Sequence, residues 1–113
     1  MGLLNNKVPV YVVNGFLESG KTTFIQETLS DPYFSDGGKT LLIACEEGEE
    51  EYDAHILESY DVVQVTIEGK AEFTPEFLED CKKQYKPTQV MIEYNGMWGM
   101  QMLREIQMPR GWF

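Results

Sequence analysis

The sequence predicts an α/β fold in which a mainly parallel sheet of about four strands lies between two layers of helices. Two apolar runs, 8–13 and 40–45, are continuous rather than alternating, which is typical of strands covered on both faces. Segments with helical spacing separate the predicted strands, and a glycine-containing loop follows the first run. Strands that alternate with helices join by right-handed crossovers, so we expect a ligand site at the carboxyl ends of the strands.

The stretch 15–22 reads GFLESGKT and fits the pattern G-x-x-x-x-G-K-[ST] of a phosphate-binding P-loop. In such a loop, backbone N–H groups surround phosphate oxygens, the lysine reaches the β- and γ-phosphates, and the hydroxyl ligates Mg²⁺. The glycines let the backbone approach an anion closely, and the following helix points the positive end of its dipole at the phosphates. The residues expected to bind the phosphates of a nucleotide are Gly15, Glu18, Ser19, Gly20, Lys21, Thr22 and Thr23.

The alternative is an ordinary strand-to-helix turn that matches the pattern by chance, which we expect in on the order of a few chains per thousand of this length. The surrounding sequence argues against chance. An apolar strand precedes the motif, and a helix with Phe24, Ile25 and Leu29 on its apolar face follows it. A P-loop NTPase-type α/β/α fold requires this order of strand, loop and helix.

Several boundaries of the remaining elements follow from local chemistry. Asp31 and Pro32 end the first helix, because the residue before a proline is driven out of the α region. Thr74 and Pro75 fit the N-cap and first position of a later helix. The third strand alternates in part and is expected nearer an edge of the sheet. The predicted elements after the first helix are a strand at 40–45, a helix at 49–60, a strand at 61–67, a helix from 75, a strand at 88–93 and a helix at 98–108.

Length and composition exclude several classes of protein. The 113 residues indicate one domain, 1–113, and their formal net charge of −10 argues against nucleic acids and anionic membranes as partners. No run approaches the roughly 20 apolar residues of a membrane span, and signal-peptide features are missing, so a cytoplasmic location is the default expectation. Cys45 and Cys81 fit neither a disulfide framework nor a C-x-x-C motif and are expected to be buried thiols.

A P-loop site also needs an acidic group at a nearby strand end to hold Mg²⁺ or its water. Glu93 closes the fourth apolar run, and Gly96 lies three residues on, where backbone amides can approach a γ-phosphate. The alternative is a surface carboxylate at a strand end, and the P-loop favours the metal role. His55, the lone histidine, lies away from the apolar side of its predicted helix and is expected to be solvated.

Three motifs in this order resemble the CobW-like GTPases, relatives of the metal-insertion GTPases HypB and UreG. GFLESGKTT at 15–23 is similar to the family opening G-F-L-G-[SA]-G-K-T-T. CEEGEEEYD at 45–53 keeps the two glutamates, the glycine and the final aspartate of the family segment N-E-F-G-E-x-x-x-D. EYNG at 93–96 is similar to the Walker B element E-x-x-G of the family.

The resemblance implies a domain that binds and hydrolyses GTP with Mg²⁺, in which 46–53 is a switch that couples nucleotide state to delivery of zinc, cobalt or nickel. It also implies a client metalloprotein, or the C-terminal remainder of a longer chain, as a partner, and a homodimer is a further expectation. The expected catalytic residues are Lys21, Glu93 and Glu49, and the expected metal-site residues are Thr22, Asp53, Glu93 and Glu46.

The sequence departs from the family pattern at three places. IEGK at 67–70 stands where the family has its C-x-C-C metal motif, and Glu18 replaces a small residue inside the phosphate loop. No guanine-reading N-K-x-D motif occurs. The chain therefore looks like the N-terminal part of the family domain, a truncated or minimal form, and we expect Trp112 and Phe113 to be exposed.

Two other functions fit the same residues. An ATP-using P-loop kinase or ATPase shares the phosphate loop but has a different base pocket. A catalytically silent interaction module would keep the fold without the chemistry, which Glu18 and the missing cysteines favour.

Overall fold

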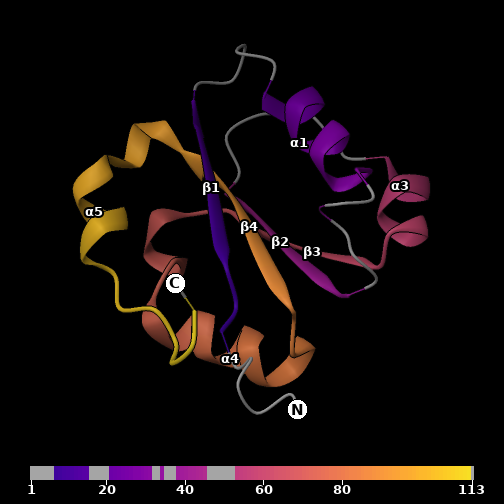
Figure 1. Cartoon of the computed structure of the whole chain (residues 1–113). Helices are drawn as coiled ribbons and strands as arrows, with labels where there is room; N and C mark the ends of the chain where they lie inside the picture. Colours follow the sequence, from indigo (N-terminus) through magenta and orange to yellow (C-terminus); the bar gives the residue numbers. More distant parts are fainter. Residues whose placement is uncertain (1–6, 16–20, 32–33, 35–37, 46–52, 113) are drawn as a thin grey trace.

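The structure, a computed structural model, describes residues 7–15, 21–31, 34, 38–45 and 53–112, and at residues 14, 15, 21 and 22 it describes only the backbone. This part of the chain folds into a four-stranded, all-parallel sheet with helices on both faces, as predicted (Figure 1). The strands are β1 (Val10–Gly15), β2 (Thr40–Cys45), β3 (Val62–Ile67) and β4 (Gln89–Asn95). The helices are α1 (Lys21–Leu29), α3 (Ala54–Ser59), α4 (Pro75–Tyr85) and α5 (Met100–Glu105), with short 3₁₀ helices η2 (Lys70–Glu72) and η3 (Gly96–Trp98).

The strand order β1-β4-β2-β3 explains how the helices divide between the two faces. The chain crosses the sheet in one direction from β1 to β2 to β3, and then turns back from β3 to β4. Because crossovers between parallel strands share one hand, this reversal moves the connecting helix to the opposite face. Figure 1 shows α1 and α3 on one side of the sheet and α4 and α5 on the other.

Each face of the sheet has its own hydrophobic core. β2 is buried along its whole length and supplies alternate residues to the two cores, which explains its unbroken apolar sequence. β3 lies at an edge, and half-buried valines alternate with the exposed Gln64 and Thr66 between its two buried ends, in agreement with the predicted partial alternation. The core beneath α1 and α3 contains Ile25, Leu29, Leu42, Ala44, Val62 and Met91. The core beneath α4 and α5 contains Leu41, Ile43, Cys45, Ile67, Phe73, Leu78, Cys81, Val90, Ile92, Tyr94 and Trp112.

Two predicted helices are shorter than their periodicity indicates. Asp53 has an extended backbone and caps α3, so this helix begins at Ala54, and positions 49–52 of the predicted helix lie outside the described residues. Gly99 has a φ of 90°, which separates η3 from α5, and Ile106 returns to extended backbone. The prediction of one helix over 98–108 was therefore wrong, because local backbone conformation breaks a pattern that side-chain spacing leaves intact.

Trp112 is buried, contrary to the expectation that it is exposed, and Phe113 lies outside the described residues. The Trp112 side chain is only 6% exposed, and its backbone forms a parallel bridge with Val8, whose N–H donates to the Gly111 carbonyl at 2.7 Å. The chain after α5 thus returns to the sheet beside the start of β1. Aromatic residues near an end of a sequence can reach the core when the backbone pairs with a distant strand, and sequence spacing does not report such pairing.

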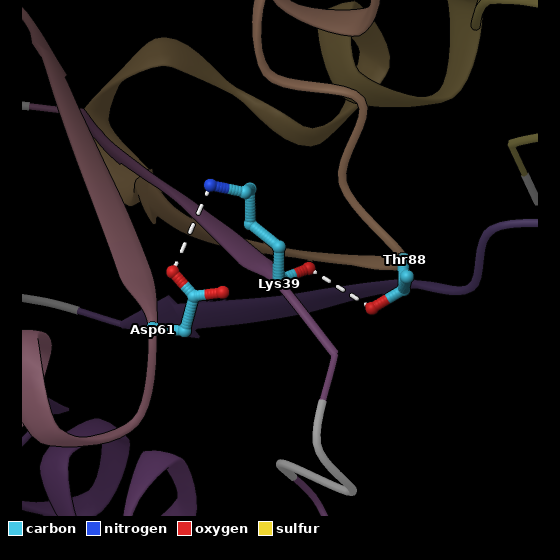
Figure 2. Close-up of polar contacts among 3 residues, drawn as sticks. All are labelled: Lys39, Asp61 and Thr88. Carbon is cyan, nitrogen blue, oxygen red and sulfur yellow. Dashed lines mark hydrogen bonds and ion pairs between the residues drawn. The ribbon is translucent and has the colours of Figure 1, made fainter.

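The amino ends of the strands are tied together by polar contacts, which Figure 2 shows. The Thr88 hydroxyl donates to the Lys39 carbonyl at 3.0 Å, joining the residues before β4 and β2. The Lys39 ammonium lies 3.7 Å from a carboxylate oxygen of Asp61, the residue before β3. Both contacts lie at the amino ends of the strands, so the carboxyl ends form the opposite edge of the sheet.

Candidate functional site

The P-loop motif lies where a parallel strand passes into a helix. Gly15 is the last residue of β1, and Lys21 is the first residue of α1. Ile25 and Leu29, both fully buried, hold α1 against the sheet, so the start of the helix is fixed beside the carboxyl end of β1. The first free backbone N–H groups of α1 and the positive end of its dipole are therefore placed at this edge of the sheet.

Glu93 lies on the strand next to the P-loop strand. The register of the parallel pair places Glu93 opposite Val13 and Asn95 opposite Gly15. Val90, Ile92 and Tyr94 of β4 face the α4 side, so alternation places Glu93 on the α1 side. The structure thus brings the half-buried Glu93 to the same face and the same edge as the beginning of α1.

The segment after Glu93 bends sharply at the end of β4. The buried Asn95 side chain accepts the Met97 N–H at 2.8 Å and caps η3, which begins at Gly96. Because Asn95 pairs with Gly15, the EYNG segment and the start of the P-loop are adjacent in space. The predicted turn at Asn95-Gly96 is confirmed.

Tyr94 anchors this bend from the other face of the sheet. Its hydroxyl donates to the Gly99 carbonyl at 2.6 Å, and its ring packs edge-on against Trp98. Burial, and secondarily the charge of Cys45, raises the pKa of Tyr94, so the hydroxyl remains a hydrogen-bond donor to higher pH than an ordinary tyrosine does. This hydrogen bond joins the segment after Glu93 to the start of α5.

Asp53 is the N-cap of α3, and the structure connects it to α1. Its carboxylate accepts the His55 N–H at 2.9 Å, while its own backbone N–H donates to Oε1 of Gln26 at 2.6 Å. The final aspartate of the proposed switch segment is therefore held against the P-loop helix. Sequence reasoning missed Gln26, because a polar residue in a helix gives no indication of a bond to a residue 27 positions away.

The structure describes some of the other predicted residues, and the rest lie outside its described part. Lys21, Thr22 and Thr23 form the first turn of α1, and the Thr23 side chain is exposed. His55 is exposed, as expected. Cys45 and Cys81 are buried free thiols, also as expected. Predicted residues that lie outside the described part of the chain are Glu18, Ser19, Gly20, Glu46 and Glu49.

The described residues at this edge of the sheet fit a Mg²⁺ ion that a bound nucleotide would share. Among the described residues, no group of three or more His, Cys, Asp or Glu side chains could hold a metal ion. Mg²⁺ in phosphate-transfer sites is bound by one or two protein groups together with water and the phosphates of the ligand. One carboxylate, Glu93, beside the start of α1 is consistent with that arrangement.

A family model for the CobW/HypB/UreG nucleotide-binding domain matches residues 9–107, most of the chain. The chain belongs to this family. The match confirms the resemblance carried by the three sequence motifs, and it agrees with the parallel α/β sheet. Neither the comparison with curated proteins nor that with solved structures gives a match.

Because the chain belongs to the CobW/HypB/UreG family, it is a nucleotide-binding domain of the P-loop GTPase type. The matched residues include the P-loop, the acidic segment 46–53 and EYNG at 93–96. No helix in the described part of this CobW/HypB/UreG domain is long and apolar enough to cross a membrane.

Proposed function

We propose that this protein binds GTP with Mg²⁺ and hydrolyses it to GDP and phosphate. The observation that carries the proposal is the adjacency of three parts: the end of β1, the start of α1, and Glu93 on the neighbouring strand. A phosphate loop and an acidic strand end on one edge of a sheet are the parts that phosphoryl transfer to water requires.

In this proposal the backbone amides of residues 18–22 and the Lys21 ammonium bind the phosphates. Thr22 and Glu93, with Asp53 further out, would hold Mg²⁺, which when bound neutralises charge on the phosphates. Glu46 or Glu49 would orient the attacking water or bind a second metal. The protein's part in catalysis is then to position groups and stabilise charge on the leaving phosphate.

We further propose that 46–53 is a nucleotide-dependent switch. Its last residue, Asp53, is bonded to Gln26 one turn into the P-loop helix, and it also begins α3. A displacement of α1 on nucleotide binding would therefore act directly on the end of this segment. Delivery of a transition metal to a client protein is the family-based extension of this switch.

The partners proposed are the nucleotide, a client metalloprotein or the C-terminal remainder of a longer chain, and a second copy of the chain. We propose that nucleic acids and anionic membranes are not partners, because a net charge of −10 would repel them. We also propose a cytoplasmic location.

Isothermal titration of a non-hydrolysable GTP analogue with Mg²⁺ tests the proposed binding. We expect Lys21→Ala to weaken binding about tenfold or more, because a charged hydrogen-bond donor to phosphate is lost. Lys39→Ala is the matched control, since it removes one positive charge at the opposite edge of the sheet. Equal binding by wild type and Lys21→Ala would contradict the proposal and favour the catalytically silent module.

Competition and turnover separate the remaining alternatives. Tighter binding of ATP than of GTP would favour the ATP-using kinase or ATPase. Release of phosphate from GTP should fall in Glu93→Gln, which removes the carboxylate charge and keeps the shape of the side chain. Unchanged phosphate release in that variant would remove Glu93 from the proposed site.

A further inference from the structure

A cavity of about 290 Å³ lies at the edge of the sheet opposite to the P-loop. Val8 before β1, Thr88 before β4 and Trp112 line it, together with the end of α4. β1 has six residues, so roughly 20 Å of strand separates this cavity from the P-loop. A ligand bound here would not overlap a nucleotide at the proposed site.

The charge of the cavity is opposite to that of the protein. The chain has 19 acidic and 9 basic residues, yet Lys7, Lys82 and Lys86 line the cavity, and no carboxylate is among its described lining residues. The next lysine along α4, Lys83, instead lines a separate cavity with Glu76, Glu79 and Asp80. The three lysines thus form a positive region within a strongly negative molecule.

The C-terminal end of α4 explains only part of this clustering. A helix C-terminus attracts cations, which accounts for Lys82 in the last turn. Lys7 precedes β1 and belongs to no helix, and Lys86 follows α4 in a left-handed conformation with a φ of 47°. Glycine or asparagine is the usual residue at such a position, so helix ending alone does not favour lysine there.

Two residues that line the cavity, Trp112 and Lys82, carry hydrogen-bond donors that can serve a bound acceptor. Trp112 is 6% exposed, and its buried Nε1–H has no hydrogen-bond partner among the described residues. A buried donor without a partner costs about 1–3 kcal/mol, which a bound acceptor would offset. The Lys82 ammonium donates one bond to the Arg110 carbonyl at 2.8 Å, which fixes the ammonium and leaves two further N–H groups.

We propose that this cavity binds a phosphate dianion, either free or as part of a small phosphate ester. Ammonium groups from Lys82 and Lys86, with Lys7 beside them, would bind the phosphate oxygens, and Trp112 would donate its indole N–H. Lysine binds phosphate as a point charge, and the two positive charges of Lys82 and Lys86 match a dianion better than a monoanion.

The test is an NMR titration of inorganic phosphate into the full chain at constant ionic strength. We expect a saturable shift of the Trp112 indole N–H resonance, whereas the indole of Trp98, which packs against Tyr94 near the other edge, stays unchanged. Running the same titration in Lys21→Ala separates this cavity from phosphate bound at the P-loop. Phenyl phosphate in place of inorganic phosphate distinguishes an ester from the free ion.

Lys86→Asn is the informative variant, because asparagine accepts the left-handed conformation and removes the charge. We expect phosphate to bind it about tenfold more weakly, while Lys83→Gln, the matched control on the same helix, binds as wild type does. The proposal is overturned by the lack of a saturable Trp112 shift, by an equal loss in Lys83→Gln, or by acetate binding as tightly as phosphate. If Lys86→Asn does not fold, the wild-type titration still decides the matter.

Discussion

At the residue scale, two glycines differ in what surrounds them. A Cβ built on Gly38 would overlap the Thr88 hydroxyl, which is bonded to the Lys39 carbonyl. A Cβ built on Gly69 meets nothing within 4 Å, and the backbone of Gly69 is extended. The first glycine therefore permits the close approach of the segments before β2 and β4, whereas the second has no such role.

We predict that Gly38→Ala lowers the free energy of unfolding by about 1–3 kcal/mol through overpacking. Gly69→Ala should be neutral or stabilising by up to about 1 kcal/mol, because it restricts the unfolded chain without strain. Urea denaturation measures both values. The cost of Gly38→Ala should shrink in a Thr88→Ala background, and an unchanged cost there would contradict the proposed overlap.

At the element scale, α4 has sequence signals for its start and its buried face. The Thr74 hydroxyl oxygen accepts the Phe77 N–H at 3.1 Å, and Pro75 occupies the first helical position. Leu78 and Cys81 are buried beneath the helix, and Lys86 ends it in the left-handed conformation. The cap, the proline and the apolar positions can be recognised within one or two turns of sequence, whereas a lysine in the left-handed conformation cannot.

We predict that Thr74→Ala destabilises the protein by about 1 kcal/mol, since the N-cap bond is lost and a backbone donor is left to water. Thr74→Ser keeps the hydroxyl and should be close to wild type. Thermal or urea unfolding of the three proteins tests this. If the alanine and serine variants are equally destabilised, the loss comes from the threonine methyl group and not from the cap.

At the scale of the whole molecule, burial makes stability depend on alkaline pH. Burial, with a smaller effect of the Asp80 carboxylate, raises the pKa of Cys81 to about 11 from 9.0. Between these values the folded protein keeps a proton that the unfolded chain releases, so the free energy of unfolding falls as pH rises. The raised pKa of Tyr94 acts in the same direction.

We predict that wild type loses stability from pH 9 to 11 more steeply than Cys81→Ala does. The difference in slope should be up to about 1.4 kcal/mol per pH unit, the value for one proton. Urea midpoints measured at several pH values give the slopes. Parallel slopes for the two proteins would mean that Cys81 does not supply the pH dependence.

Prediction from sequence succeeded where the information is local. The run 40–45 and the pair Thr74 and Pro75 have the predicted structure, because burial on both faces and helix capping depend on adjacent residues. The P-loop pattern and EYNG were also recognisable, since both are contiguous. The bounds of α3 and α5 were wrong, because Asp53 and Gly99 change backbone conformation inside a continuous apolar pattern.

The sequence by itself determined the class of this protein: a parallel α/β domain of the P-loop type with a loop for phosphate and a carboxylate after an apolar strand. Only the tertiary structure decided that β4 inserts between β1 and β2, which places Glu93 beside the P-loop strand. It alone joined Gln26 to Asp53 and Val8 to Trp112. The physical reason is that strand order and such contacts depend on pairing between distant segments, which no local pattern of residues encodes.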